Sequence, residues 1–402
     1  MSSILKITPD FYWLGALDPN LRVFDIIMET EFGTSYNAYL LKGTEGIALF
    51  ETVKDKFFNE YLEKLKSIIS LEEINYIVVD HTEPDHAGSV AKLLELAPHI
   101  TVVGSQLAIK YISEMINAPF KSLVVKEGDV LSLGNKTIKF ISVPQLHWPD
   151  TMYSYVEEDR LLITCDSFGA HYADECILKS ELESEKEEDY ISAYKYYFDM
   201  IMGPFKPFVQ KALHKIKDLS IEYICPGHGL ILDASNMKKY IDLYDTWSQP
   251  VTHEKSIVIA YVSAYGYTKE LAETIEKGIL DSGYTGKVSL YNLETDSLES
   301  VMEKISTAEG LLLGSPTILA EALPPIWQIL CSLNPVMHKH IAMSCFGSYG
   351  WSGEALVHLE ERIKQLKCPM PVKPLGVTFK PSEKDLENAR TFGADFAAFL
   401  QN

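Results

Sequence analysis

The chain has 402 residues, of which 47% are hydrophobic and 23% charged, a composition typical of a globular protein with more than one domain. Its formal net charge of −20 argues against a nucleic-acid partner, because the phosphates would be repelled. No apolar run reaches the roughly 18 residues of a membrane span, and residues 1–6 lack the apolar core of a secretory signal. We therefore expect a cytoplasmic protein without a membrane partner.

Residues 1–250 are predicted to be rich in strands, with helices between them. Candidate strands lie at residues 33–41, 46–50, 74–79, 101–103, 137–143, 152–156 and 161–164, and helices at 57–69 and 89–96. The charged stretch 179–189 is interpreted as a solvated loop or helix face. Pro250 marks a linker within residues 247–254, where the pattern changes.

After the linker, strands and helices alternate. Strands are predicted at residues 256–262, 288–291, 310–313 and 340–345, and helices at 268–280, 298–305, 326–333 and 353–365. This alternation is typical of a doubly wound parallel sheet with helices on both faces. We therefore expect two domains, residues 1–250 and residues 255–402.

The six cysteines are widely scattered and form no Cys-x-x-Cys pair. This spacing excludes the usual zinc-ribbon and rubredoxin ligand pairs and fits a reducing compartment. We expect no iron–sulfur or rubredoxin centre within the chain itself. The cysteines are Cys165, Cys176, Cys225, Cys331, Cys345 and Cys368.

Four potential metal ligands, His81, Glu83, Asp85 and His86, fall within six positions directly after the apolar run at 77–79. Burying such groups without partners costs about 1–3 kcal/mol for each one. A metal ion, or a pair of ions, is the simplest common partner. Glu83 is a hard oxygen donor at a position where a zinc hydrolase of similar pattern carries a histidine.

Three further candidates, His147, Asp166 and His228, lie in loops or at strand ends. Taken singly, each has an ordinary explanation, since a loop histidine is usually polar surface and such an aspartate is usually a turn or cap residue. Together with the earlier four they make seven ligand-type residues in a fixed order.

This order resembles the metal site of the flavodiiron proteins, a branch of the metallo-β-lactamase fold. Zinc members of that fold carry His-x-His-x-Asp-His, and the chain departs from it at Glu83 as the flavodiiron branch does. Carboxylate with imidazole suits iron, which changes oxidation state, whereas zinc does not. The resemblance implies that one iron is held by His81, Glu83 and His147 and the other by Asp85, His86 and His228, with Asp166 bridging both.

The same resemblance singles out two residues near the metals. His171 matches a histidine that recurs near the family's site, where it either orients a ligand or substrate or makes a plain structural hydrogen bond. Tyr197 matches a tyrosine that the family places over the diiron pocket. Its alternative interpretation is an ordinary aromatic core position.

A loop that follows an apolar strand and opens a helix predicts a phosphate site. Its hydroxyl groups, backbone N–H groups and helix N-terminus fit a phosphate monoester. The loop resembles the flavodoxin phosphate loop, with Tyr265 in place of the middle threonine. The candidate residues are Ser263, Tyr265, Gly266, Tyr267 and Thr268.

Two later loops follow predicted strands, where flavodoxins surround the isoalloxazine ring of FMN. Tyr349 and Trp351 either flank that ring or are surface aromatics in a glycine-rich turn. Without a Gly-x-Gly-x-x-Gly motif, a Rossmann NAD site is not expected. The candidates are Pro316, Thr317 and Ile318 in the first loop and Gly347, Ser348, Tyr349, Gly350 and Trp351 in the second.

The resemblance covers nearly the whole chain and matches the minimal two-domain type of flavodiiron protein. It implies an αββα metallo-β-lactamase-like sandwich followed by a flavodoxin-like doubly wound sheet. It also implies an oxidoreductase that reduces O₂ to water or NO to N₂O at two irons, with FMN relaying electrons. The donor would be a separate rubredoxin, or reduced coenzyme F420 in some relatives, and the assembly a head-to-tail homodimer or a tetramer.

Three alternatives remain open. A zinc-dependent hydrolase with an accessory flavodoxin domain would share the fold but should prefer histidine at position 83. A non-catalytic redox sensor would keep FMN and tolerate loss of metal ligands. A reduced-F420 oxidase would use the same diiron site.

Overall fold

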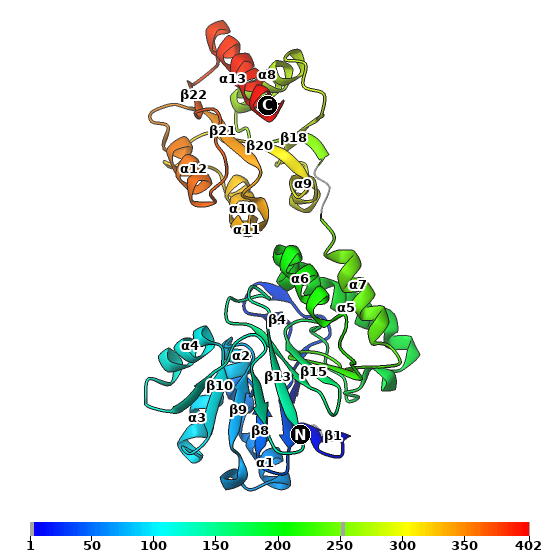
Figure 1. The fold of residues 1–402 in the computed structure, drawn as a ribbon. Helices are drawn as coiled ribbons and strands as arrows, with labels where there is room; N and C mark the ends of the chain where they lie inside the picture. Colours follow the sequence, from blue (N-terminus) through cyan, green and yellow to red (C-terminus); the bar gives the residue numbers. More distant parts are fainter. Residues whose placement is uncertain (1–3, 251–253, 402) are drawn as a thin grey trace. The chain divides into compact units, whose positions relative to one another are not determined.

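The computed structural model describes residues 4–250 and 254–401, and the chain divides into two compact units, residues 1–250 and 251–402 (Figure 1). The predicted linker at 247–254 falls partly on residues 251–253, which lie outside the described residues. Within the described residues, no helix combines the length and apolarity that a membrane span requires.

The first unit contains two large sheets. The seven-stranded sheet has the order β1 (Leu5–Thr8), β2 (Phe11–Trp13), β7 (Tyr39–Lys42), β8 (Ile47–Phe50), β9 (Tyr76–Val79), β10 (Thr101–Gly104) and β11 (Lys121–Val124). The six-stranded sheet has the order β12 (Val130–Ser132), β13 (Thr137–Ser142), β14 (Met152–Val156), β15 (Leu161–Cys165), β16 (Tyr223–Pro226) and β17 (Leu232–Asp233).

One apolar core lies between these two sheets, because strands of both contribute to it. It combines Phe50 and Val78 of the first sheet with Phe140 and Ile163 of the second. Strand β14 is buried on both faces. Its residues alternate between this core and a second core, as the two-residue period of a strand requires.

Helices cover the outer face of each sheet (Figure 1). The first sheet packs against α1 (Phe58–Ile68), α3 (Val90–Leu96) and α4 (Gln106–Ile116), and the second against α5 (Glu187–Tyr197), α6 (Lys206–Ile216) and α7 (Met237–Trp247). Each helix buries an apolar stripe against its sheet. The resulting αββα sandwich confirms the predicted fold of this part of the chain.

One sequence-based expectation for this unit was wrong in detail. The strand expected over residues 33–41 is divided into β6 (Thr34–Tyr36), which pairs with β3 (Ala16–Asp18), and β7 in the large sheet. Asn37 lies at the break, where its backbone N–H donates to the carbonyl of Gly227. The stretch 179–189, interpreted as a solvated loop or helix face, contains two short 3-10 turns and the start of α5, and most of its residues are exposed.

The second unit is a five-stranded parallel sheet with strand order β19-β18-β20-β21-β22. This is the flavodoxin-like order 2-1-3-4-5, and it confirms the predicted doubly wound fold. Helices α8 and α13 cover one face, and α9, α10 and α12 cover the other. The strands are β18 (Glu254–Tyr261), β19 (Lys287–Asn292), β20 (Ala308–Gly314), β21 (Ala342–Tyr349) and β22 (Leu375–Thr378); the helices are α8 (Tyr267–Asp281), α9 (Leu298–Ile305), α10 (Pro324–Ser332), α11 (Pro335–His338), α12 (Glu354–Gln365) and α13 (Glu383–Gln401).

Candidate active site

The ligand-rich segment after β9 is held by a buried carboxyl group. Oε1 of Glu51 accepts hydrogen bonds from the backbone N–H groups of Asp80 at 2.7 Å and His81 at 3.1 Å. Burial raises the pKa of Glu51 to about 7, against the lowering effect of nearby histidines. The chain then enters the short helix α2 (Pro84–Ala87), which carries Asp85 and His86.

The remaining predicted ligands reach the same place from the second sheet. Asp166 follows β15 and His228 follows β16, and these neighbouring strands are parallel, so both residues leave the same edge of the sheet. His147 precedes β14 in a loop. Four separate segments of the chain therefore converge on one site.

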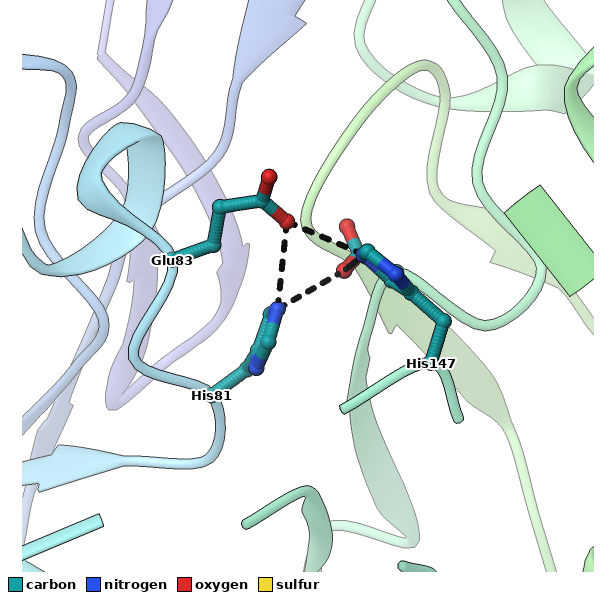
Figure 2. A group of neighbouring side chains, drawn as sticks. His81, Glu83 and His147 are labelled. Carbon is teal, nitrogen blue, oxygen red and sulfur yellow. Dashed lines mark hydrogen bonds and ion pairs between the residues drawn. The ribbon is translucent and has the colours of Figure 1, made fainter. Parts of the chain in front are cut away.

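His81, Glu83, His147 and Asp166 form a first group of ligand atoms, and Figure 2 labels the first three of them. Oε2 of Glu83 lies 2.9 Å from Nε2 of His147 and 3.3 Å from Nε2 of His81. Oδ2 of Asp166 lies 3.3 Å and 3.4 Å from the same two nitrogens. These separations suit donor atoms around one central ion with bonds of about 2.0–2.2 Å.

Asp85, His86 and His228 form the second group. Nε2 of His228 lies 3.0 Å from Oδ2 of Asp85, and Nε2 of His86 lies 3.6 Å from Oδ1 of Asp85. Oδ1 of Asp166 lies 3.0 Å from Nε2 of His86 and 3.6 Å from Nε2 of His228. Asp166 thus turns one carboxylate oxygen toward each group, which is the arrangement a bridging ligand needs.

Several of these atoms lack a well-formed hydrogen bond. Both carboxylate oxygens of Asp85 and Oδ2 of Asp166 are buried, and their contacts with histidine nitrogens, at 3.0–3.6 Å, do not have hydrogen-bond geometry. Burying a carboxylate with incomplete hydrogen bonding is costly. One metal ion within each group would coordinate these atoms, so the residues present fit a pair of metals. The mixture of carboxylate and imidazole donors suits iron.

The charges around the histidines determine whether their ring nitrogens carry protons when no metal is bound. Burial alone would lower the pKa of His86, but Asp85 and Asp166 outweigh it and raise the pKa to about 10. The pKa of His147 is likewise raised to about 9 by its hydrogen bonds to Asp166 and Glu83. Without metal these histidines are protonated at neutral pH, so a metal ion must displace protons on binding.

Tyr197 and His171, the two residues predicted near the metals, both lie at this site. The hydroxyl of Tyr197 donates to Oδ1 of Asp166 at 2.9 Å. Nδ1 of His171 lies 3.0 Å from Oγ1 of Thr34, and its Nε2 is buried without a partner among the described residues. Burial lowers the pKa of His171 to about 3, so its ring is neutral at physiological pH.

A hairpin formed by β4 (Val23–Phe24) and β5 (Met28–Glu29) also reaches this site. The ring of Phe24 packs 4.4 Å from that of His171, measured between centroids. The carboxyl group of Asp25 shares a hydrogen bond with Glu83, and burial together with the Glu83 and Asp85 charges raises the pKa of Asp25. No motif in the sequence pointed to either residue.

The predicted flavin residues lie at the carboxyl ends of three neighbouring strands, β18, β20 and β21. Oγ1 of Thr268, in the first turn of α8, lies 3.2 Å from Oγ of Ser348. The backbone N–H of Thr317 donates to the carbonyl of Ser348 at 3.1 Å. All three predicted loops are therefore brought together at one edge of the sheet.

This edge of the sheet fits a flavin phosphate. Gly266 adopts a φ of +84° just before α8, a conformation that favours glycine, and no group beyond its chain neighbours and helix backbone lies within 4 Å of where a Cβ would stand. The helix N-terminus beside it favours an anion. Trp351 is fully exposed and Tyr265 is 81% exposed, so both rings have a free face for a planar cofactor.

Comparison with known proteins agrees with this architecture. A family model described as ODP family beta lactamase matches residues 34–229, and a flavodoxin model matches residues 259–393. The chain is 39% identical over 400 residues to flavo-diiron protein FprA2 of Clostridium acetobutylicum, covering 98% of each chain. The chain belongs to the flavodiiron protein family.

Two further relatives of this flavodiiron chain carry more specific names. A protein of Moorella thermoacetica named nitric oxide reductase is 35% identical over 403 residues, covering 99% of each chain. The solved structure of rubredoxin oxygen:oxidoreductase from Desulfovibrio gigas aligns with a TM-score of 0.70 and 30% identity, covering 99% of each chain.

Family membership confirms three of the sequence-based expectations. The chain is an oxidoreductase, and its cofactors are a non-haem diiron pair and FMN. When bound, these groups supply electrons to a small substrate. The assignment of individual ligands stays a prediction that the geometry above supports.

Sequence reasoning missed several residues that shape this flavodiiron site. Glu51 and Asp150 hold the loop backbone from distant segments, and Thr34 contacts His171. Each is a single polar residue in a loop or at a strand end. Such a position carries no local signal, because its partners are set only by the folded chain.

Proposed function

We propose that this flavodiiron protein reduces O₂ to two waters or two NO to N₂O and water at the two clustered metal sites. The observation that carries the proposal is the pair of ligand groups sharing Asp166, with the oxygen donor Glu83 where zinc enzymes have histidine. Two ferrous ions and a reduced flavin hold four electrons, the number that O₂ reduction consumes together with four protons. NO reduction consumes two electrons and two protons for every N₂O formed.

The roles of the chain's own residues follow from their contacts. Asp166 would hold both irons at a fixed separation, since it reaches both groups. The Tyr197 hydroxyl keeps a proton at Asp166, because burial and the neighbouring carboxylates raise its pKa well above 10. Phe24 and His171 close the side next to His228.

We further propose that electrons enter beside His147. A hollow of about 520 Å³ with a mainly apolar lining reaches His147, and its lining residues are Tyr111, Glu114, Met115, His147, Trp148 and Pro149. The flavin of a second chain, bound head to tail, fits such a surface by its planar and apolar character. The assembly would then be a homodimer, or a tetramer built from such dimers.

A dilution series tests the assembly. Size-exclusion chromatography and gas consumption are measured on the same samples, and activity should fall in step with the dimer fraction. Full activity from the monomer would contradict a head-to-tail arrangement. A tetramer peak with activity that survives dissociation to dimers would show that the dimer suffices.

The reaction is tested by anaerobic purification and by quantifying iron, zinc and FMN per chain. O₂ and NO consumption are then compared with reduced rubredoxin and with reduced coenzyme F420 as alternative donors. We expect two irons, one FMN and uptake of at least one gas. Zinc in place of iron, or uptake of neither gas, would overturn the proposal in favour of a hydrolase or a sensor.

We also propose a reducing compartment, the cytoplasm, for this protein. All six cysteines are free, and the sulfur of Cys331 is on an exposed residue. An exposed thiol that persists unpaired is typical of reducing surroundings. Cell fractionation with an antibody to the chain tests the location.

A further inference from the structure

Asp150 is a buried carboxylate that joins the two ligand-bearing loops of the first metal group. Its Oδ2 accepts hydrogen bonds from the backbone N–H of Thr82 at 2.9 Å and from the Thr82 hydroxyl at 2.8 Å. The same oxygen lies 3.4 Å from Nδ1 of His81. Asp150 is fully buried, as are both of its partners, and it follows His147 by three residues.

His81 is the only basic side chain within ion-pair distance of Asp150 in the described chain. A buried carboxylate needs a compensating donor. Oδ2 of Asp150 faces the Nδ1 side of the His81 ring.

The two histidines of the second group lack a carboxylate partner of this kind among the described residues. Nδ1 of His228 donates to the backbone carbonyl of Ser35 at 2.6 Å, and Nδ1 of His86 is buried without a partner among the described residues. A carboxylate behind an imidazole fixes the tautomer with its proton on Nδ1 and leaves Nε2 free for a metal. Such a carboxylate also makes Nε2 a stronger electron-pair donor to the metal than a backbone carbonyl in the same place would.

We propose that Asp150 is a positioning residue, which holds the His81 ring through Nδ1 and strengthens its Nε2 as the ligand of one iron only. The inference rests on the proposed role of His81 as an iron ligand. A carboxyl group that merely fastened the loop backbone would be weakened by loss of the Thr82 hydroxyl as well as by loss of its own charge. Asp150 therefore makes the two irons electronically different.

The deciding variant is Asp150→Asn, which keeps a side chain of the same size and removes the charge. We expect the affinity for one of the two irons to fall about 10- to 100-fold, as loss of such partners does elsewhere. Chelator competition on protein reconstituted with ⁵⁷Fe measures the affinity. In the Mössbauer spectrum of the loaded protein, one quadrupole doublet should shift and the other should stay.

Thr82→Val is the matched control, because it removes one hydrogen bond to Asp150 without touching the His81 contact. Both doublets and both iron affinities should stay as in the wild type. Equal losses in the two variants, or unchanged affinities and doublets in Asp150→Asn, would overturn the inference and leave Asp150 as a loop fastener.

If Asp150→Asn does not fold, the wild-type protein answers the same question. The sample contains zinc in place of iron and ¹⁵N-labelled histidine. The signal of the His81 Nδ1–H is assigned by its loss in His81→Gln. In the wild-type protein this proton should exchange slowly with solvent. Fast exchange would overturn the inference. A wild type that binds no iron overturns this inference and the proposed metal site together, whereas a two-iron wild type that consumes neither gas overturns the proposed reaction alone.

Discussion

The hydroxyl of Tyr197 donates a 2.9 Å hydrogen bond to Oδ1 of Asp166, the carboxylate that lies between the two ligand groups. Tyr197 comes from the last turn of α5 and Asp166 from the end of β15. Neither side chain is exposed. The contact joins the helical layer over the second sheet to the atoms proposed to bridge the irons.

Tyr197→Phe should leave the iron content unchanged and lower gas reduction about ten- to a hundredfold. The variant loses a hydrogen bond to an ionised group, worth about 1.5–3 kcal/mol, and about 1.4 kcal/mol corresponds to tenfold in rate. Gas consumption at saturating donor and iron per chain are the measurements. Tyr194→Phe is the control, because its hydroxyl donates to the carbonyl of Tyr240 at 3.3 Å, away from the metals. Equal rates in wild type and Tyr197→Phe would show that the hydroxyl is structural.

Gly227→Ala should cost the protein one of its irons. A Cβ at residue 227 would lie 2.5 Å from Cε1 and 3.0 Å from Nδ1 of His86, so the ring must move. Iron per chain should fall from two toward one, measured after reconstitution. Gly203→Ala is the matched control, because the nearest atom to its Cβ is 3.5 Å away. Two tightly bound irons in Gly227→Ala would contradict the assignment of His86 as a ligand.

The sequence predicted the parts of this site that lie close together along the chain. The segment 81–86 concentrates four ligand residues in six positions, and the flavin loops follow strands whose carboxyl ends must meet at one edge. The division of the strand at 33–41 could not be predicted, because alternation of side chains continues through Asn37. Its cause is a hydrogen bond to Gly227, which is distant in sequence.

Asp150 and Asp25 were missed for a related reason. An aspartate in a loop has an ordinary local explanation as a turn residue, whatever its partners in the fold. Asp150 is recognised only once the Thr82 and His81 donors lie against it. Asp25 reaches Glu83 from a hairpin of two-residue strands, which leave no periodic pattern to detect.

The metal-free protein should lose stability as the pH rises from 7.5 to 8.5, and the iron-loaded protein should not. The pKa values of His86 and His147 are raised to about 10 and about 9, above the value near 6.5 of an unfolded chain. Their stabilisation is complete below about pH 6.5 and is lost as the pH rises through those folded values. Each such histidine contributes a slope of about 1.4 kcal/mol per pH unit.

Urea unfolding of both forms at the two pH values measures this difference. The carboxyl of Glu51, with a pKa of about 7, is already mostly ionised at both pH values and contributes less to the slope than the two histidines. Buried thiols and phenols affect both forms alike, so the comparison removes them. Parallel losses in the metal-free and iron-loaded forms would show that metal and protons do not compete for these nitrogens.

Trp351→Ala should weaken FMN binding about tenfold without destabilising the protein. The indole ring is fully exposed, so little packing is lost on truncation. An aromatic contact to a flavin ring is worth about 0.5–1.5 kcal/mol beyond the buried area. Fluorescence titration of the flavin-free protein gives the Kd, and thermal unfolding of the same protein gives the stability. Phe399→Ala, at an exposed residue of α13, should leave the Kd unchanged.

Glu83→His should shift metal occupancy toward zinc and abolish gas reduction. Oε2 of Glu83 lies between the Nε2 atoms of His147 and His81, so a third imidazole there would complete a nitrogen-rich site that suits zinc. Zinc does not change oxidation state and cannot pass electrons to a gas. Metal analysis of protein grown with both ions, and O₂ and NO uptake, are the measurements. Glu83→Asp keeps an oxygen donor and should retain iron, and unchanged iron content and turnover in Glu83→His would show that the choice of metal is made elsewhere in the site.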